Sequence, residues 1–133
     1  MNTLKANITD IHTSGSLSLV SLQSGNQSLK SIVIDTPDTA AYLQVGEEVN
    51  IIFKEMEVSI ATEEQLPISL QNRIYGTIST IDRSDLLSRV VLSTDLGQIT
   101  SVITTASVDR LELQPGQKVF ALIKTNELML SKE

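Results

Sequence analysis

The chain has 133 residues and a formal net charge of -6, with 41% hydrophobic residues, 3% aromatic residues and no cysteine. The excess of acidic residues argues against a nucleic-acid partner, which requires clustered lysine and arginine. The absence of cysteine excludes disulfides, thiolate zinc sites and a cysteine nucleophile. We therefore expect a core of Val, Ile and Leu in a protein that does not bind nucleic acid.

The chain also lacks the patterns of a membrane protein or an enzyme. Its first residues include no apolar segment typical of a signal peptide, and no apolar run approaches the roughly 18 residues that span a bilayer. The only histidine, His12, lies in a polar stretch with no nucleophile spaced to use it, and the acidic residues are scattered. We expect a cytoplasmic protein with no membrane partner, no catalytic activity, no resident metal and no cofactor.

The sequence matches itself without a gap at a constant offset of 70 positions. Identical pairs run along the whole length, and they include Asn2 and Asn72, Ile8 and Ile78, Gly46 and Gly116, and Lys54 and Lys124. Chance would seldom keep one register over such a length, so the pattern indicates a duplication. The predicted organisation is a first unit at residues 1–63, a linker at 64–70 and a second unit at 71–133.

In chain order, the first unit has runs typical of short strands at 5–11, 16–22, 29–35, 49–54 and 58–62, with a short helical segment at 36–43. The second unit repeats this order, with strands at 73–81, 87–94, 98–105, 118–124 and 127–131 and a helix at 106–113. Five strands with a helix after the third are typical of a small OB-like barrel. The predicted fold is all-β: two tandem OB-like small β-barrels, each with five strands and one short helix. One continuous β-sandwich of about ten strands is the alternative.

Short polar side chains gather where the third strand of the second unit ends and its helix begins. They are Ser101, Thr104, Thr105 and Ser107. Hydroxyls and free backbone N–H groups at such a point suit an anion. Lys54 and Lys124 recur at matched strand ends and could supply positive charge. The alternative is that the hydroxyls only cap the helix and the lysines only solvate the strand ends.

The segment SVITTASVDRLELQPGQKVFALIKTNELML resembles the Mop, or molbindin, domain of the TOBE class. The likeness rests on ITTAS at 103–107, on Gly116, Val119 and Ala121, and on Ile123 with Lys124. SLQNRIYG at 69–76 is similar to the family's opening SARNQLKG, and the first unit resembles a diverged second copy. The resemblance implies a cytoplasmic binder of molybdate or tungstate for storage or homeostasis. It also implies a homo-oligomer, typically a trimer, with oxyanion sites at subunit interfaces. A sensing or assembly module that acts on a molybdate transporter or regulator is the alternative.

Carried over by position, the resemblance places oxyanion ligands in both units. With the hydroxyls above, the candidates are Ser69, Gln71, Asn72, Ser101, Thr104, Ser107, Lys124, Thr125 and Asn126 in the second unit, and Asn2, Ser31 and Lys54 in the first. A tetrahedral dianion offers only acceptors, so hydroxyls, amides and ammonium groups suit it. Gln71 replaces the family's arginine, and Glu55 places a carboxylate beside Lys54. We expect the sites of the second unit to bind better than those of the first.

Overall fold

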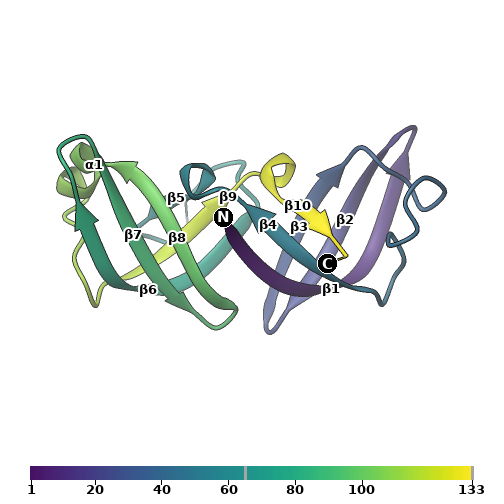
Figure 1. The fold of residues 1–133 in the computed structure, drawn as a ribbon, viewed down its shortest axis with the longest axis horizontal. Helices are drawn as coiled ribbons and strands as arrows, with labels where there is room; N and C mark the ends of the chain where they lie inside the picture. Colours follow the sequence, from purple (N-terminus) through teal and green to yellow (C-terminus); the bar gives the residue numbers. More distant parts are fainter. Residues whose placement is uncertain (65, 133) are drawn as a thin grey trace.

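A computed structural model describes residues 1–64 and 66–132; residue 65, in the predicted linker, and residue 133, at the end of the predicted second unit, lie outside the described part. The chain forms two five-stranded sheets that lie side by side (Figure 1). The elements of the first repeat are β1 (Asn2–Ser14), β2 (Leu17–Ser24), β3 (Gln27–Val33), β4 (Glu48–Phe53), the 3-10 helix η1 (Glu55–Glu57) and β5 (Ser59–Ala61). Those of the second are β6 (Asn72–Arg83), β7 (Leu87–Thr94), β8 (Gly97–Thr104), α1 (Thr105–Arg110), β9 (Lys118–Ile123), η2 (Thr125–Glu127) and β10 (Met129–Ser131).

The elements of the two repeats correspond at the sequence offset. Apart from α1, every element of the second repeat has a counterpart that begins 70 positions earlier. Even the irregularities match, since the ladder of β1 and β2 shifts register between Ile8 and Asp10 and that of β6 and β7 between Ile78 and Thr80. The duplication in the sequence is therefore also a duplication of backbone structure.

The two repeats exchange their last strands. The first sheet has the order β10-β4-β1-β2-β3, and the second has the order β5-β9-β6-β7-β8. In Figure 1 the yellow strand β10 accordingly lies among the strands of the first repeat, and β5 lies beside β9 of the second. The predicted boundaries at 63 and 71 thus mark sequence repeats, whereas each sheet draws its strands from both.

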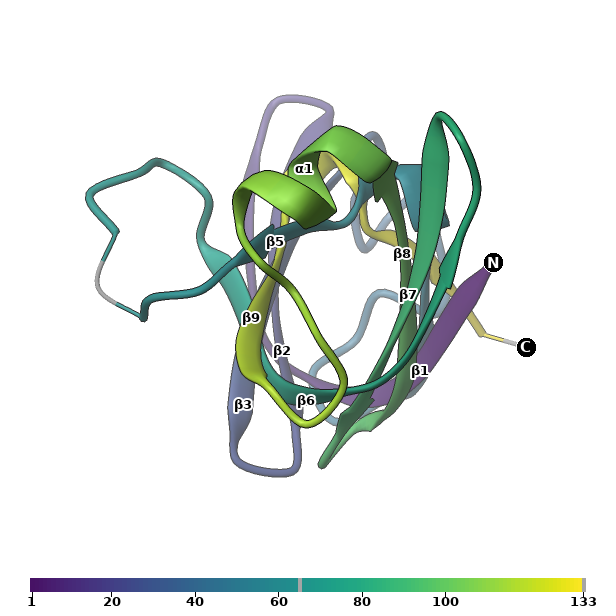
Figure 2. The same cartoon turned by 90° about the vertical axis from the view of Figure 1, so that its left-hand side faces the viewer.

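Each sheet curls in the manner of an OB-like unit, as predicted, and the ten-stranded sandwich is not the observed arrangement. Figure 2 shows the curl of the second sheet, with α1 across one end. The edge strands of a sheet approach each other without a backbone ladder. Ser31 Oγ donates to the carbonyl of Leu128 (2.7 Å) at one seam, and Ser101 Oγ donates to that of Val58 (2.8 Å) at the other.

The predicted helix of the first unit is wrong, because turns occupy residues 37–39 and 41–42 there. In the second repeat, Thr104 caps α1 by accepting a hydrogen bond from the N–H of Ser107 (3.1 Å). The corresponding positions carry Ile34, which has no side-chain oxygen, and Pro37, which has no N–H to donate. The first repeat therefore lacks both halves of the cap that starts the helix.

The core is aliphatic, as the composition predicts, and it forms one continuous cluster that includes residues of both repeats. Buried and exposed residues alternate along β1 and β6, so one face of each strand points into this core. Phe53 and Ile123, which end β4 and β9, are both fully buried beside the crossing points. The repeats thus share one hydrophobic core and do not have separate cores. In the described part of the chain, every helix is too short to cross a membrane.

Candidate functional site

Two buried asparagines join the repeats. Asn2 donates from Nδ2 to the carbonyl of Thr100 (2.8 Å) and accepts at Oδ1 from the N–H of the same residue (2.8 Å). Asn72 makes the equivalent bonds with Lys30 (2.9 and 2.7 Å). Because β3 and β8 are edge strands, each amide satisfies backbone groups that no neighbouring strand pairs. Both residues are predicted ligands, and the structure gives their side chains a role in holding the repeats together.

Two buried serines also form hydrogen bonds between the repeats. The bonds from Ser31 to Leu128 and from Ser101 to Val58 both run from an edge strand to the residue that follows a 3-10 helix of the other repeat. Both side chains are fully buried. Each serine therefore attaches the exchanged segment of one repeat to the sheet of the other.

Lys54 and Lys124 stand where the chain crosses from one sheet to the other. They follow β4 and β9, precede η1 and η2, and are exposed. Within residues 1–64 and 66–132, neither ammonium group makes a hydrogen bond or an ion pair. Both cations are therefore available to a ligand from solution.

The structure groups the predicted residues across the repeats, whereas the sequence groups them within each repeat. Asn2 pairs with Phe53 in the β1–β4 ladder, directly before Lys54, and η1 packs on β8. In the same way, Asn72 pairs with Ile123 in the β6–β9 ladder, directly before Lys124, and η2 packs on β3. We name the first set, Asn2, Lys54 and Ser101, the Lys54 cluster. The second set, Ser31, Asn72, Lys124, Thr125 and Asn126, is the Lys124 cluster.

The carboxylate of Glu55, expected to oppose an anion beside Lys54, has a cationic partner. Its Oε2 accepts a hydrogen bond from the amino group of Met1 (2.9 Å). That hydrogen bond is the main cause that lowers the pKa of Glu55, and the charge of Arg89 acts in the same direction. The backbone N–H of Lys54 is also bound, to Glu57 Oε1 (3.0 Å). The charge of Glu55 is therefore compensated by the amino group of Met1, whereas the carboxylate of Glu57 is bound only by a backbone N–H among the described residues.

Thr104 and Ser107 lie at the start of α1 and bind each other. Thr104 Oγ1 donates to Ser107 Oγ (2.9 Å) in addition to capping the helix. Ser107 lines a cavity of about 220 Å³ together with Arg110 of α1 and Ser59 of β5. Thr104 thus caps the helix, as the alternative interpretation holds, and Ser107 also lines a cavity beside β5, the exchanged strand that follows the Lys54 cluster.

Ser69, in the linker, and Gln71, at the start of the second unit, are exposed, and the linker beside them is held by a residue that the sequence did not single out. Arg73 on β6 donates four hydrogen bonds to linker carbonyls, those of Glu64 (2.8 Å), Leu66 (2.8 Å), Leu70 (3.2 Å) and Ile68 (3.3 Å). In Figure 2 the described linker residues project from the side of the second sheet. The repeat gives a signal for this role, since Arg73 corresponds to Thr3, an uncharged residue.

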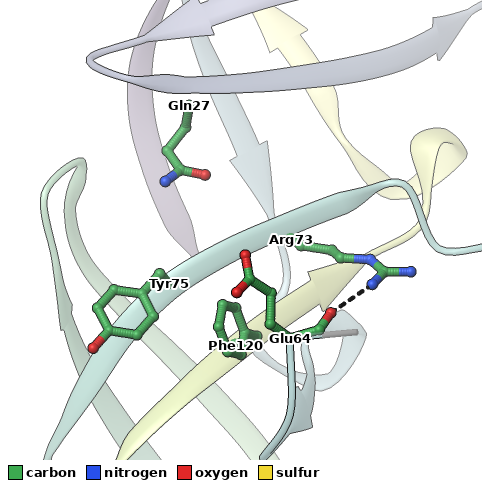
Figure 3. A pocket seen from close by; sticks show the side chains of 5 residues that line it. All are labelled: Gln27, Glu64, Arg73, Tyr75 and Phe120. Atoms are coloured by element: carbon green, nitrogen blue, oxygen red, sulfur yellow. Dashed lines mark hydrogen bonds between the residues drawn. The ribbon is translucent and has the colours of Figure 1, made fainter. Parts of the chain in front are cut away.

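Arg73 also borders a cavity of about 230 Å³ on the outer side of the second sheet (Figure 3). Tyr75 and Phe120, paired across β6 and β9, place their ring centroids 5.3 Å apart at its base. Gln27, at the start of β3, reaches toward it from the first repeat. None of the predicted ligand residues lines this cavity, so it is separate from both clusters.

The described residues contain no group of three or more His, Asp or Glu side chains that could hold a metal ion. Taken together, the two clusters offer one exposed ammonium group each, and the Lys124 cluster adds the hydroxyl of Thr125 and the amide of Asn126, close to backbone that the hydrogen bonds between the repeats hold in place. These groups are hydrogen-bond donors, and they suit an oxygen-rich anion better than a cation.

Comparison with known proteins matches residues 68–130 to the TOBE domain. The structure superimposes on that of the cytoplasmic molybdate-binding protein ModG with molybdate bound, with a TM-score of 0.89 and 26% identity over 98% of this chain and 94% of that one. The Molybdenum-pterin-binding protein MopA of Rhodobacter capsulatus is 31% identical over 98% of this chain and 50% of its own length. The Molybdenum transport protein ModE of Azotobacter vinelandii is 29% identical over 67% of this chain. The chain spans half or less of the length of these curated relatives, and 33% in the case of ModE.

Proposed function

Because this chain belongs to the Mop family of TOBE-class proteins, we propose that it binds molybdate or tungstate in the cytoplasm, for storage or homeostasis and without catalysis. The observation that carries the proposal is the pair of lysines at equivalent crossing points, neither of which has a partner among the described residues. The likeness to ModG along nearly the whole of both chains supports the ligand class.

The donor set supports a tetrahedral dianion. Lys124 offers a compact positive charge, and Thr125 and Asn126, the next two residues, offer a hydroxyl and an amide. Lys54 offers the same charge at the other crossing point. Hydrogen bonds from charged donors to an anion are among the strongest that proteins make. Ser69, Gln71, Thr104 and Ser107 are proposed as further donors, and the backbone groups beside Asn2, Ser31, Asn72 and Ser101 complete the sites.

We also propose that the sites lie at interfaces of a homotrimer. Each cluster is exposed on one side and contains a single lysine, so one chain by itself leaves a dianion half coordinated. A neighbouring subunit would add donors from its own linker or helix start. Sharing a site in this way allows a chain with a net charge of -6 to gather positive charge locally.

Titration calorimetry with sodium molybdate tests the proposal, with Lys54→Ala and Lys124→Ala variants and Lys132→Ala as the control for loss of a lysine. Each of the first two variants should weaken one class of site by about tenfold or more, because a charged hydrogen bond is lost. Native mass spectrometry should find a trimer with several oxyanions bound. No heat of binding with molybdate or tungstate would refute the proposal.

The second candidate function is a sensing or assembly module that acts on a molybdate transporter or regulator. The likeness to ModE, a molybdenum transport protein of which this chain spans 33%, favours it. The two functions differ in stoichiometry and in the need for a partner. Several oxyanions per assembly support storage, whereas one or two, with an affinity that changes when a partner protein is added, support sensing.

A further inference from the structure

A pair of aromatic side chains lies on the outer face of the second sheet, apart from both clusters. Tyr75 of β6 is 41% exposed, and Phe120 of β9, its partner in the ladder, is half-buried. Their ring centroids lie 5.3 Å apart, and the planes of the rings are tilted by 55°. The whole chain has only two tyrosines and two phenylalanines, and neither ring of this pair packs on the hydrophobic core. Half of the aromatic residues are therefore placed together where the core does not use them.

The first repeat lacks this pair, so the fold itself does not require it. Lys5 and Asn50 stand at the positions that correspond to Tyr75 and Phe120, and they too face each other across their ladder. The same part of the sheet thus forms with an ammonium group and an amide in place of two rings. We infer that the aromatic pair gives the second sheet a property that the first sheet does not have.

The cavity of about 230 Å³ beside the rings also holds a carboxylate and an amide that are not in use. Glu64, in the linker, and Gln27, at the start of β3, both line it, and Figure 3 shows their side chains reaching toward the space beside Tyr75 and Phe120. Among the described residues, neither the carboxylate of Glu64 nor the amide of Gln27 has a hydrogen-bond partner or an ion pair. Both groups are therefore available to a ligand in the cavity.

The guanidinium of Arg73 borders the same cavity, but it is engaged elsewhere. Its four hydrogen bonds all go to carbonyls of the linker, including that of Glu64 (2.8 Å). In Figure 3 it points away from the two rings and toward this carbonyl. An anion in the cavity would find few free donors on Arg73, whereas a cation would find the free carboxylate of Glu64.

We propose that this cavity binds an organic cation, namely the ammonium or guanidinium head of a protein side chain or of a small molecule. The face of an aromatic ring carries negative potential, so it attracts a cation that lies within about 6 Å of the ring centroid. Glu64 adds a full negative charge beside Phe120, and the amide oxygen of Gln27 accepts a hydrogen bond. The inference does not rest on the proposed function, because none of the predicted oxyanion ligands lines this cavity.

Nuclear magnetic resonance of the whole chain, with carbon-13 in the tyrosine and phenylalanine rings, tests the site with choline as the probe. Choline should shift the signals of Tyr75 and Phe120 with a Kd of about 1–10 mM, and those of Tyr42 and Phe53 should not move. The matched control ligand is 3,3-dimethylbutan-1-ol, which has the shape of choline without its charge and should bind about tenfold more weakly. Acetyl-lysine amide and acetyl-arginine amide distinguish the sources of the cation. Tighter binding of either amide than of choline indicates a protein side chain, and the reverse indicates a small molecule.

Three variants assign the binding to the rings and the carboxylate. Tyr75→Leu keeps an apolar side chain without an aromatic face, and Glu64→Gln removes the charge, so each should weaken choline binding by about threefold. Glu63→Gln is the control, since it removes an exposed neighbouring carboxylate that does not line the cavity, and it should change the Kd by less than about 1.5-fold. Thermal unfolding verifies that each variant is folded. If the neutral alcohol binds as tightly as choline, or if the first two variants behave like the control, the cation site is refuted, whatever the result with molybdate.

Discussion

Replacing Asn72 with alanine tests the link between the repeats. The side chain of Asn72 is fully buried and makes two hydrogen bonds, of 2.9 and 2.7 Å, to the backbone of Lys30. Each such bond contributes about 1 kcal/mol net, and a polar group left unsatisfied costs about 1–3 kcal/mol. Since Lys30 is half-buried, water can reach part of the orphaned backbone. We expect Asn72→Ala to lower the free energy of unfolding by about 2–3 kcal/mol.

Differential scanning calorimetry without ligand measures this effect. For a chain of this length, a loss of that size should lower the melting temperature by about 6–15 °C. The matched control is Asn126→Ala, at an exposed asparagine of η2, which should change the melting temperature by less than about 2 °C. If Asn72→Ala melts within about 2 °C of the unaltered protein, the amide does not hold the repeats together.

Three further predictions concern the amino-terminal ion pair, the linker and the exchange. The lowered pKa of Glu55 makes the charged form stabilising: this stability is present above the unfolded-state pKa and is lost as the pH falls through the folded-state pKa. The difference in unfolding free energy between the unaltered chain and Glu55→Gln, from urea titrations, should therefore disappear in acid, and a difference independent of pH would contradict it. Arg73→Leu should speed cleavage of the linker by a glutamate-specific protease, because four carbonyl bonds are lost, and an unchanged rate would show that they do not restrain it. Residues 68–132 alone cannot pair β9 with β5, so light scattering should find a dimer that exchanges β10, and a folded monomer would overturn this reading.

Much of the fold could be predicted from the sequence, because strands and turns depend on local patterns. The runs at 5–11 and 73–81 indicated strands, and the structure places them in β1 and β6, along which buried and exposed residues alternate. The helix predicted for the first unit is absent for an equally local reason, because Ile34 and Pro37 cannot form the helix cap. A closer comparison of these two positions with Thr104 and Ser107 would have predicted that absence from the sequence.

The candidate site was only partly predictable. The recurrence of Lys54 and Lys124 marked them as equivalent, and the structure places them at equivalent crossing points without partners in the described chain. The residues that surround each lysine could not be predicted from the sequence, because they come from the other repeat. Ser31 contacts the segment after η2, and Ser101 contacts the segment after η1.

The sequence by itself determined the duplication, the order of the strands along each repeat, the aliphatic core and the family. These features depend on local patterns and on the match of the sequence with itself at an offset of 70. Only the tertiary structure decided which repeat completes which sheet and which residues meet in each cluster. The physical reason is that both repeats have nearly the same strand pattern, so β5 could pair with β4 or with β9 as far as the sequence is concerned. Packing and the cross-repeat bonds of Asn2, Asn72, Ser31 and Ser101 select the exchanged pairing, and with it the composition of each site.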